Sequence, residues 1–99
     1  MGRANNEYLN EIASDLPGYM VFYVASTGNK SYDDTDITED AYHILIQNTG
    51  ASNLTFEINS DSNVYTVLAG KESLEFKYRE PITAVDITAT DTFTLLIRQ

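Results

Sequence analysis

The sequence predicts a small all-β protein, a single antiparallel β-sandwich or jelly roll of about seven strands, with a short N-terminal helix or arm. Three observations predict this class. Segments rich in β-branched and aromatic residues recur roughly every ten residues from residue 42 to residue 99. Clusters of Asn, Ser, Asp and Gly separate these segments and favour turns. The 99 residues, 42% of them hydrophobic, are enough for one domain with its own core.

The sequence divides into an N-terminal segment, residues 1–18, and a sandwich domain, residues 19–99. Asn6 can cap a short helix that ends at Pro17-Gly18. The apolar residues of this helix would share one face: Tyr8, Leu9, Ile12, Ala13 and Leu16. An extended arm is the alternative, because a helix of fewer than about 12 residues is marginal when isolated in water.

The sandwich strands follow from alternation and from β-forming residues. We predict them at residues 19–25, 42–47, 54–58, 64–68, 73–78, 82–89 and 93–98. Residues 26–40 break the pattern and are predicted as a loop. Gly70 is expected to take a positive φ in a hairpin, and Pro81 to begin a strand. Side chains that alternate toward one face form the predicted core: Leu54, Phe56, Ile58, Leu74, Phe76, Tyr78, Val85, Ile87, Ala89, Phe93, Leu95 and Ile97.

The charge of the protein argues against several partners. Fifteen acidic and six basic residues give a net charge of −9, and the basic residues are scattered along the sequence. Phosphate backbones and anionic membrane surfaces would be repelled, so we expect neither nucleic-acid nor membrane binding. The sequence contains neither a recognisable signal peptide nor a run of the roughly 18 apolar residues that a transmembrane helix needs.

The acidic loop at residues 33–40 is the best local candidate for a hard cation such as calcium. It contains five carboxylates: Asp33, Asp34, Asp36, Glu39 and Asp40. The helix-loop-helix calcium motif needs a glycine at its tight turn and a glutamate at its twelfth position, and neither spacing is met. We therefore expect a solvated acidic loop, no metal site and no cofactor.

No residue pattern indicates catalysis. His43 is the single histidine and lies within a predicted strand, with neither a cysteine nor a nucleophile motif to complete a site. Glu57 could form a hydrolytic acid pair with Glu75 or with Asp86, but the distance between them depends on strand pairing. We expect His43 to lie at the surface or at a rim, and the protein not to be an enzyme.

The segments of residues 42–99 resemble small virion proteins of tailed bacteriophages. The resemblance is carried by Ile-Leu-Ile-Gln-Asn-Thr-Gly, Leu-Thr-Phe-Glu-Ile-Asn, Val-Leu-Ala-Gly-Lys-Glu-Ser-Leu-Glu-Phe and the long run from Pro81 to Ile97. In those proteins a compact β-sandwich decorates or joins the head, the tail tube or the tail tip. The resemblance implies a virion protein, made in the host cytoplasm, that works through self-association and contacts with other virion proteins.

The assembly hypothesis and its alternative make different predictions. For assembly, Tyr8, Leu9 and Ile12 would be oligomer contacts, and residues 19–25 and 93–98 have few charges to protect a sheet edge. The alternative is a carbohydrate-binding module, since carbohydrate-binding sandwiches share this sequence pattern. That module would use exposed members of the seven tyrosines to stack on sugar rings, as a monomer with a calcium ion to assist.

Overall fold

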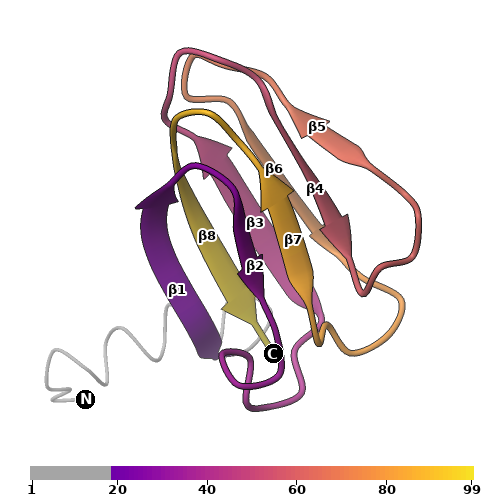
Figure 1. Ribbon diagram of the computed structural model, residues 1–99. Helices are drawn as coiled ribbons and strands as arrows, with labels where there is room; N and C mark the ends of the chain where they lie inside the picture. The colour runs from indigo at the N-terminus through magenta and orange to yellow at the C-terminus, as the bar shows by residue number, and fades with distance from the viewer. Residues whose placement is uncertain (1–18) are drawn as a thin grey trace, which may run out of the picture.

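The computed structural model describes residues 19–99 and folds them into two antiparallel four-stranded sheets (Figure 1). Along the chain the strands are β1 (Met20–Thr27), β2 (Lys30–Tyr32), β3 (His43–Asn48), β4 (Leu54–Ile58), β5 (Tyr65–Val67), β6 (Ser73–Lys77), β7 (Val85–Thr88) and β8 (Thr92–Arg98). Residues 19–99 contain no helix, which confirms the all-β class. The helix or arm predicted for residues 1–18 lies outside the described residues.

The strand order is that of a jelly roll. We call the sheet with the order β1-β8-β3-β6 sheet A and the sheet with the order β2-β7-β4-β5 sheet B. Apart from the β4–β5 hairpin, every connection crosses from one sheet to the other. This arrangement of eight strands makes two Greek keys. It also places β8, the last strand, between β1 and β3 in the middle of sheet A.

Alternation of side chains builds the core between the two sheets. In β4 and β8 every second residue is buried, as the period of two in a strand requires. The whole predicted core set faces inward; Leu74 and Phe76 are partly buried and pack against the fully buried members. Leu95 and Phe76 lie in the same sheet but on strands that are not neighbours, because β3 separates β8 from β6.

Residues 26–40, which were predicted as a loop, contain strand residues and two buried side chains. β1 continues to Thr27, and a turn at Gly28, with φ of 77°, leads into the short strand β2. β2 pairs with β7 and buries Tyr32. Ile37, from the acidic loop, is also buried in the core. A strand of three residues, two of them polar, leaves no recognisable pattern in the sequence. The formation of β2 therefore depends on its pairing with β7.

Two turn predictions need correction. Gly70 has the expected positive φ of 89°, but β5 pairs with β4 and β6 pairs with β3, so Gly70 lies in a connection between sheets and not in a hairpin. Pro81 lies in the loop before β7, which begins at Val85. A loop here lets Asn59 bind the main chain of residues 81–84 in place of a ladder partner.

At one end of the sandwich, the β3–β4 and β7–β8 connections approach each other closely. Asp91 accepts hydrogen bonds from the main chain of Ala51 and, through its carbonyl, of Gly28. A Cβ atom at Gly50 would lie 2.4 Å from the Cβ of Asp91. This contact is shorter than van der Waals packing allows, so glycine is required at position 50.

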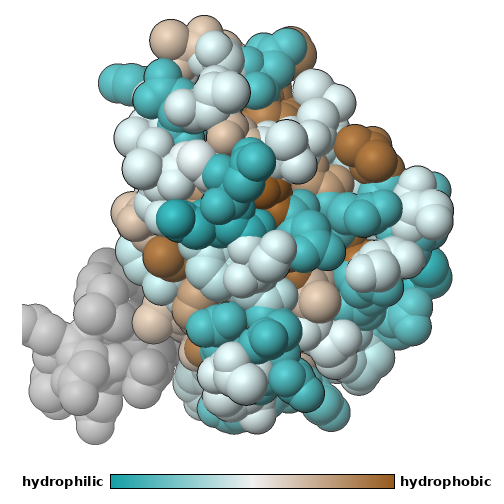
Figure 2. Space-filling model, in the orientation of Figure 1, coloured by the Kyte–Doolittle hydropathy of each residue, from teal (hydrophilic) through white to brown (hydrophobic). Residues whose placement is uncertain are grey.

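The surface is largely polar. Figure 2 shows hydrophobic residues as small separate patches among polar ones on the face that it presents. Five large hydrophobic side chains are exposed among residues 19–99: Tyr19, Met20, Tyr23, Val64 and Leu68. No helix in this part of the chain could cross a membrane.

Candidate functional site

Among residues 19–99, the outer edge of sheet A is formed by β1, which pairs with β8 on one side and with no other strand of this part of the chain (Figure 1). Its sequence, Met-Val-Phe-Tyr-Val-Ala-Ser-Thr, contains no charged residue. Met20 and Tyr23 expose 64% and 53% of their surface. The residues predicted to be a poorly protected edge, 19–25, therefore lie at an edge, whereas residues 93–98 do not, because β8 is enclosed by β1 and β3.

The other three edges differ from β1. β6 carries Glu75 and Lys77, while β2 and β5 are three residues long. Charges and shortness are common ways in which proteins protect a sheet edge from pairing with another chain. Within residues 19–99, β1 is therefore the long uncharged edge.

The inner side of β1 is fixed to the core. Phe22 packs against Tyr32 of β2, with ring centroids 5.1 Å apart, and this contact joins the edges of the two sheets. Val21 and Val24 also pack against the core cluster. The pairing with β8 is irregular between Met20 and Phe22 and regular from Phe22 to Thr27. Most of the strand is thus held in a regular register with β8.

A pocket of about 510 Å³ lies where β3 begins and where β6 and β8 end. Its lining combines aromatic and basic side chains: Tyr42, His43, Lys77, Tyr78, Arg79 and Gln99. The register explains this combination, because His43 pairs with Lys77 on one side and with Arg98 on the other. Residues opposite each other in neighbouring antiparallel strands share one face of the sheet.

The basic residues near the pocket are held in place differently. His43 Nδ1 lies 3.0 Å from the Gln99 carbonyl oxygen, within hydrogen-bond distance. Arg98 is 5% exposed and forms an ion pair with Glu75, although its Nε has no hydrogen-bond partner within residues 19–99. Within residues 19–99, no acidic side chain pairs with Lys77.

Tyr78 is the buried member of the pocket lining. Its side chain is buried, and its hydroxyl donates a hydrogen bond to the Asp61 carboxylate. Burial and the bond to Asp61 raise the pKa of Tyr78 to about 12. The same bond, together with a bond from the Asn63 main chain, lowers the pKa of Asp61. The Arg79 guanidinium lies 4.8 Å from the centre of the Tyr78 ring, in cation–π contact.

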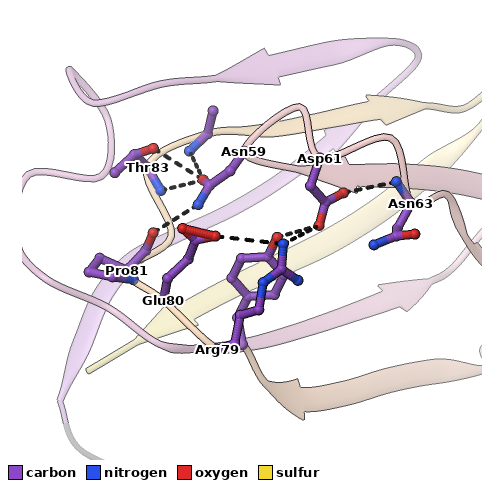
Figure 3. Close-up of polar contacts among 9 residues, drawn as sticks. Asn59, Asp61, Asn63, Arg79, Glu80, Pro81 and Thr83 are labelled. Atoms are coloured by element: carbon purple, nitrogen blue, oxygen red, sulfur yellow. Dashed lines mark hydrogen bonds and ion pairs between the residues drawn. The ribbon is translucent and has the colours of Figure 1, made fainter.

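The loop between β4 and β5 is hydrogen-bonded to the segment that follows β6 (Figure 3). Asn59 Oδ1 accepts hydrogen bonds from the main chain of Thr83 and Ala84, and its Nδ2 donates to the Pro81 carbonyl. Asn59, Ser60 and Ser62 have positive φ angles, which is uncommon for residues other than glycine. Such angles persist where surrounding contacts impose them. Here the bonds of Asn59 and Asp61 join this loop to the segment that follows β6.

The predicted site residues are distributed over separate parts of the molecule. Tyr8, Leu9 and Ile12 lie outside the described residues. Glu57 and Asp86 are direct cross-strand neighbours in sheet B, whereas Glu75 lies in sheet A, so the pair Glu57–Glu75 is not formed. His43 is partly buried and lines the pocket.

The acidic loop forms a turn stabilised by its own side chains. Asp33 accepts hydrogen bonds from the main chain and the hydroxyl of Thr35, and these bonds lower its pKa. Asp36 accepts a bond from the Asp33 main chain. Residues 19–99 contain no group of three histidine or acidic side chains that could hold a metal ion.

The tyrosines also separate into groups. Tyr32 and Tyr78 are buried, Tyr42 and Tyr65 are partly buried, and Tyr19 and Tyr23 are exposed. Tyr65 stacks on Phe56 at a centroid distance of 5.1 Å, which makes it part of the core rather than a ligand contact.

Comparison with known proteins gave no relative: no family model, no curated protein and no solved structure matches the chain. Functional inference therefore rests on the edge strand and the pocket. Sequence reasoning found the edge strand but not the pocket. Lys77 and Arg79 lie more than thirty residues from Tyr42 and His43 in the sequence, and strand pairing alone brings the two segments together.

Proposed function

We propose that this protein is a structural component of a bacteriophage virion, a head or tail accessory protein that acts through contacts with its own copies and with other virion proteins. In this proposal the protein is not an enzyme, and its place of action is the virion. Two observations support it besides the resemblance of residues 42–99. The jelly roll is an architecture of viral capsid proteins and lectins. The uncharged edge of β1 supplies a means of assembly.

The observation that carries the proposal is the chemistry of this edge. A free strand edge presents a row of unpaired main-chain N–H and C=O groups. A second strand can satisfy these groups by extending the sheet, as in complexes formed by strand addition. In β1 no charged side chain opposes such pairing, and the exposed Met20 and Tyr23 would add apolar contact area. Pairing of two β1 strands would join two copies of sheet A around a twofold axis.

Residues 1–18 would strengthen the same contact. Tyr8, Leu9 and Ile12 would lie against a neighbouring subunit, because a short amphipathic segment gains stability mainly by packing its apolar face. Tyr19, which joins this segment to β1, is bonded through its carbonyl to the Gln99 main chain. The last residue of the segment therefore directly precedes a residue that is bonded to the residue following β8.

Sedimentation velocity of the full chain tests the proposal. We expect the average mass to rise above the 11.1 kDa of a monomer as concentration increases into the high micromolar range. Tyr23→Lys places a charge on the edge and should return the protein to a monomer. Leu68→Lys is the matched control, because Leu68 is 55% exposed but lies outside β1, and it should leave association unchanged.

Deletion of residues 1–16 separates the contribution of the N-terminal segment from that of the edge. We expect the deletion to weaken association and Tyr23→Lys to abolish what remains. A protein that is monomeric at high micromolar concentration, with or without residues 1–16, would contradict assembly by self-association.

Carbohydrate binding through exposed tyrosines is the second candidate. The observation that favours it is the exposure of Tyr19, directly before β1, and of Tyr23 within β1, which expose 56% and 53% of their surface. Aromatic faces of this kind can stack on sugar rings. Assembly is preferred because the same tyrosines belong to an uncharged free edge.

A further inference from the structure

The basic residues of this acidic protein are concentrated at the end of the sandwich that holds the pocket. Lys77, Arg79 and Arg98, half of the six basic residues in the sequence, lie there together with the single histidine. Arg98 is neutralised by Glu75. Lys77 and Arg79 line the pocket itself, and Arg79 exposes 60% of its side chain. Among residues 19–99 no acidic side chain pairs with Lys77, and Arg79 is exposed, so both side chains can contact an anion.

Two acids, Asp61 and Glu80, lie within ion-pair distance of Arg79, and one of them is also hydrogen-bonded elsewhere. Asp61 lies 3.7 Å from the guanidinium, but its oxygens accept hydrogen bonds from Tyr78 and from the Asn63 main chain. Glu80 lies 3.6 Å from Arg79 and is itself exposed. Both separations exceed hydrogen-bond length, so the N–H groups of Arg79 can still bind a carboxylate.

The pocket also has the size and the aromatic surface for a ring. A volume of about 510 Å³ lies within the range of small-molecule sites, which is roughly 300 to 1,000 Å³. Tyr42 is partly buried at its wall, and His43 and Gln99 add hydrogen-bonding groups at its rim. An aromatic wall with a few fixed polar groups is the usual composition of a saccharide or drug-sized ligand site.

Part of the pocket lining is held in place by hydrogen bonds before any ligand binds. Tyr78 is bonded to Asp61, and His43 lies within hydrogen-bond distance of the Gln99 carbonyl. The Tyr42 main chain is bonded to Tyr78 and to Arg98. Fixed side chains lose little conformational entropy on binding, which favours affinity.

We propose that this pocket binds a sugar ring that carries a carboxylate, with the ring against Tyr42 and the carboxylate held by Lys77 and Arg79. The proposal goes beyond assembly and does not depend on it, since no residue that lines the pocket belongs to β1. Neutral sugars would lack the charge contact, and simple carboxylates would lack the ring contact.

Titration followed by NMR tests the proposal with four probes: glucuronate, galacturonate, methyl glucoside and acetate. We expect at least one uronate to shift the signals of Tyr42, His43 and Lys77, and to bind at least about tenfold more tightly than methyl glucoside or acetate. Raising the salt concentration should weaken the uronate complex, because exposed charges are screened.

Single substitutions test which side chains contact the uronate. Lys77→Met and Arg79→Met should each weaken uronate binding by about fivefold or more, while Lys71→Met, with the same change of net charge in a connection away from the pocket, should have no effect. Tyr42→Leu should weaken it by about 2- to 10-fold. Unchanged melting temperatures would show that each variant is folded.

Three outcomes would overturn the proposal. The first is the absence of signal shifts with either uronate at the highest soluble concentration. The second is acetate binding as tightly as the uronates with no effect of Tyr42→Leu, since the ring would then make no contact. The third is equal weakening by Lys71→Met and Lys77→Met, which would indicate attraction by net charge without a site.

Discussion

The buried hydroxyl of Tyr78 donates a hydrogen bond to the carboxylate of Asp61, and this bond joins the end of β6 to the loop between β4 and β5. Tyr78 directly follows β6 of sheet A, and Asp61 lies between two strands of sheet B. Through the contact of Tyr78 with Arg79, the bond also sets the position of a basic side chain in the pocket. A connection between sheets therefore also organises the candidate ligand site.

The Tyr78–Asp61 bond predicts how stability depends on alkaline pH. The pKa of Tyr78 rises from 10.0 to about 12 on folding, so its stabilising contribution is complete below pH 10.0 and is lost as the pH rises toward 12. Urea unfolding at several pH values should show this loss in the wild type. Tyr78→Phe should flatten the alkaline decline, whereas Tyr23→Phe, at an exposed position, should not. An equal decline in all three proteins would contradict the role of the bond.

Two leucines provide a matched test of the core. Leu95 is fully buried in β8, whereas Leu68 is exposed after β5. Leu95→Ala should lower the free energy of unfolding by about 2 to 5 kcal/mol, because it removes buried contacts and leaves a cavity. Leu68→Ala should change it by less than about 0.5 kcal/mol. Thermal and urea unfolding measure both, and similar losses for the two variants would show that the strand register is wrong.

Alternation in the sequence predicted this core because burial of one strand face leaves a pattern of period two. Leu54, Phe56 and Ile58 all face inward for that reason. The pairing of strands leaves no comparable pattern in the sequence. The order that inserts β8 between β1 and β3, and the register that places His43 beside Lys77, result from contacts between distant segments. The uncharged edge could thus be predicted from the composition of residues 19–25, whereas the pocket could not.

The contact between Gly50 and Asp91 predicts a steric effect. Gly50→Ala should destabilise the protein by about 1 to 3 kcal/mol, since the added Cβ would lie 2.4 Å from the Asp91 Cβ and force the two connections apart. Asp91→Gly in the same background removes the opposing carbon. Measured unfolding free energies should therefore show that the two substitutions together destabilise less than the sum of their separate effects.

From the contacts within the acidic loop we predict that calcium does not stabilise the protein. Asp33 is engaged by Thr35, and Asp36 by the Asp33 main chain, so the loop is stabilised without a cation. Millimolar calcium should leave the melting temperature essentially unchanged, because an ion that binds no site in the native state adds no stability. A rise of several degrees, lost on adding a chelator, would indicate a metal site and would favour the carbohydrate-module alternative.

Residue-resolved hydrogen exchange of β1 at several protein concentrations tests the central claim of assembly through this edge most directly. We predict that the β1 amides that do not bond to β8 become protected as the concentration rises into the high micromolar range. The edge amides of β6, Ser73–Lys77, should show no such change and serve as the internal control. Exchange of the free β1 amides at the same fast rate across the whole concentration range would contradict assembly through this edge.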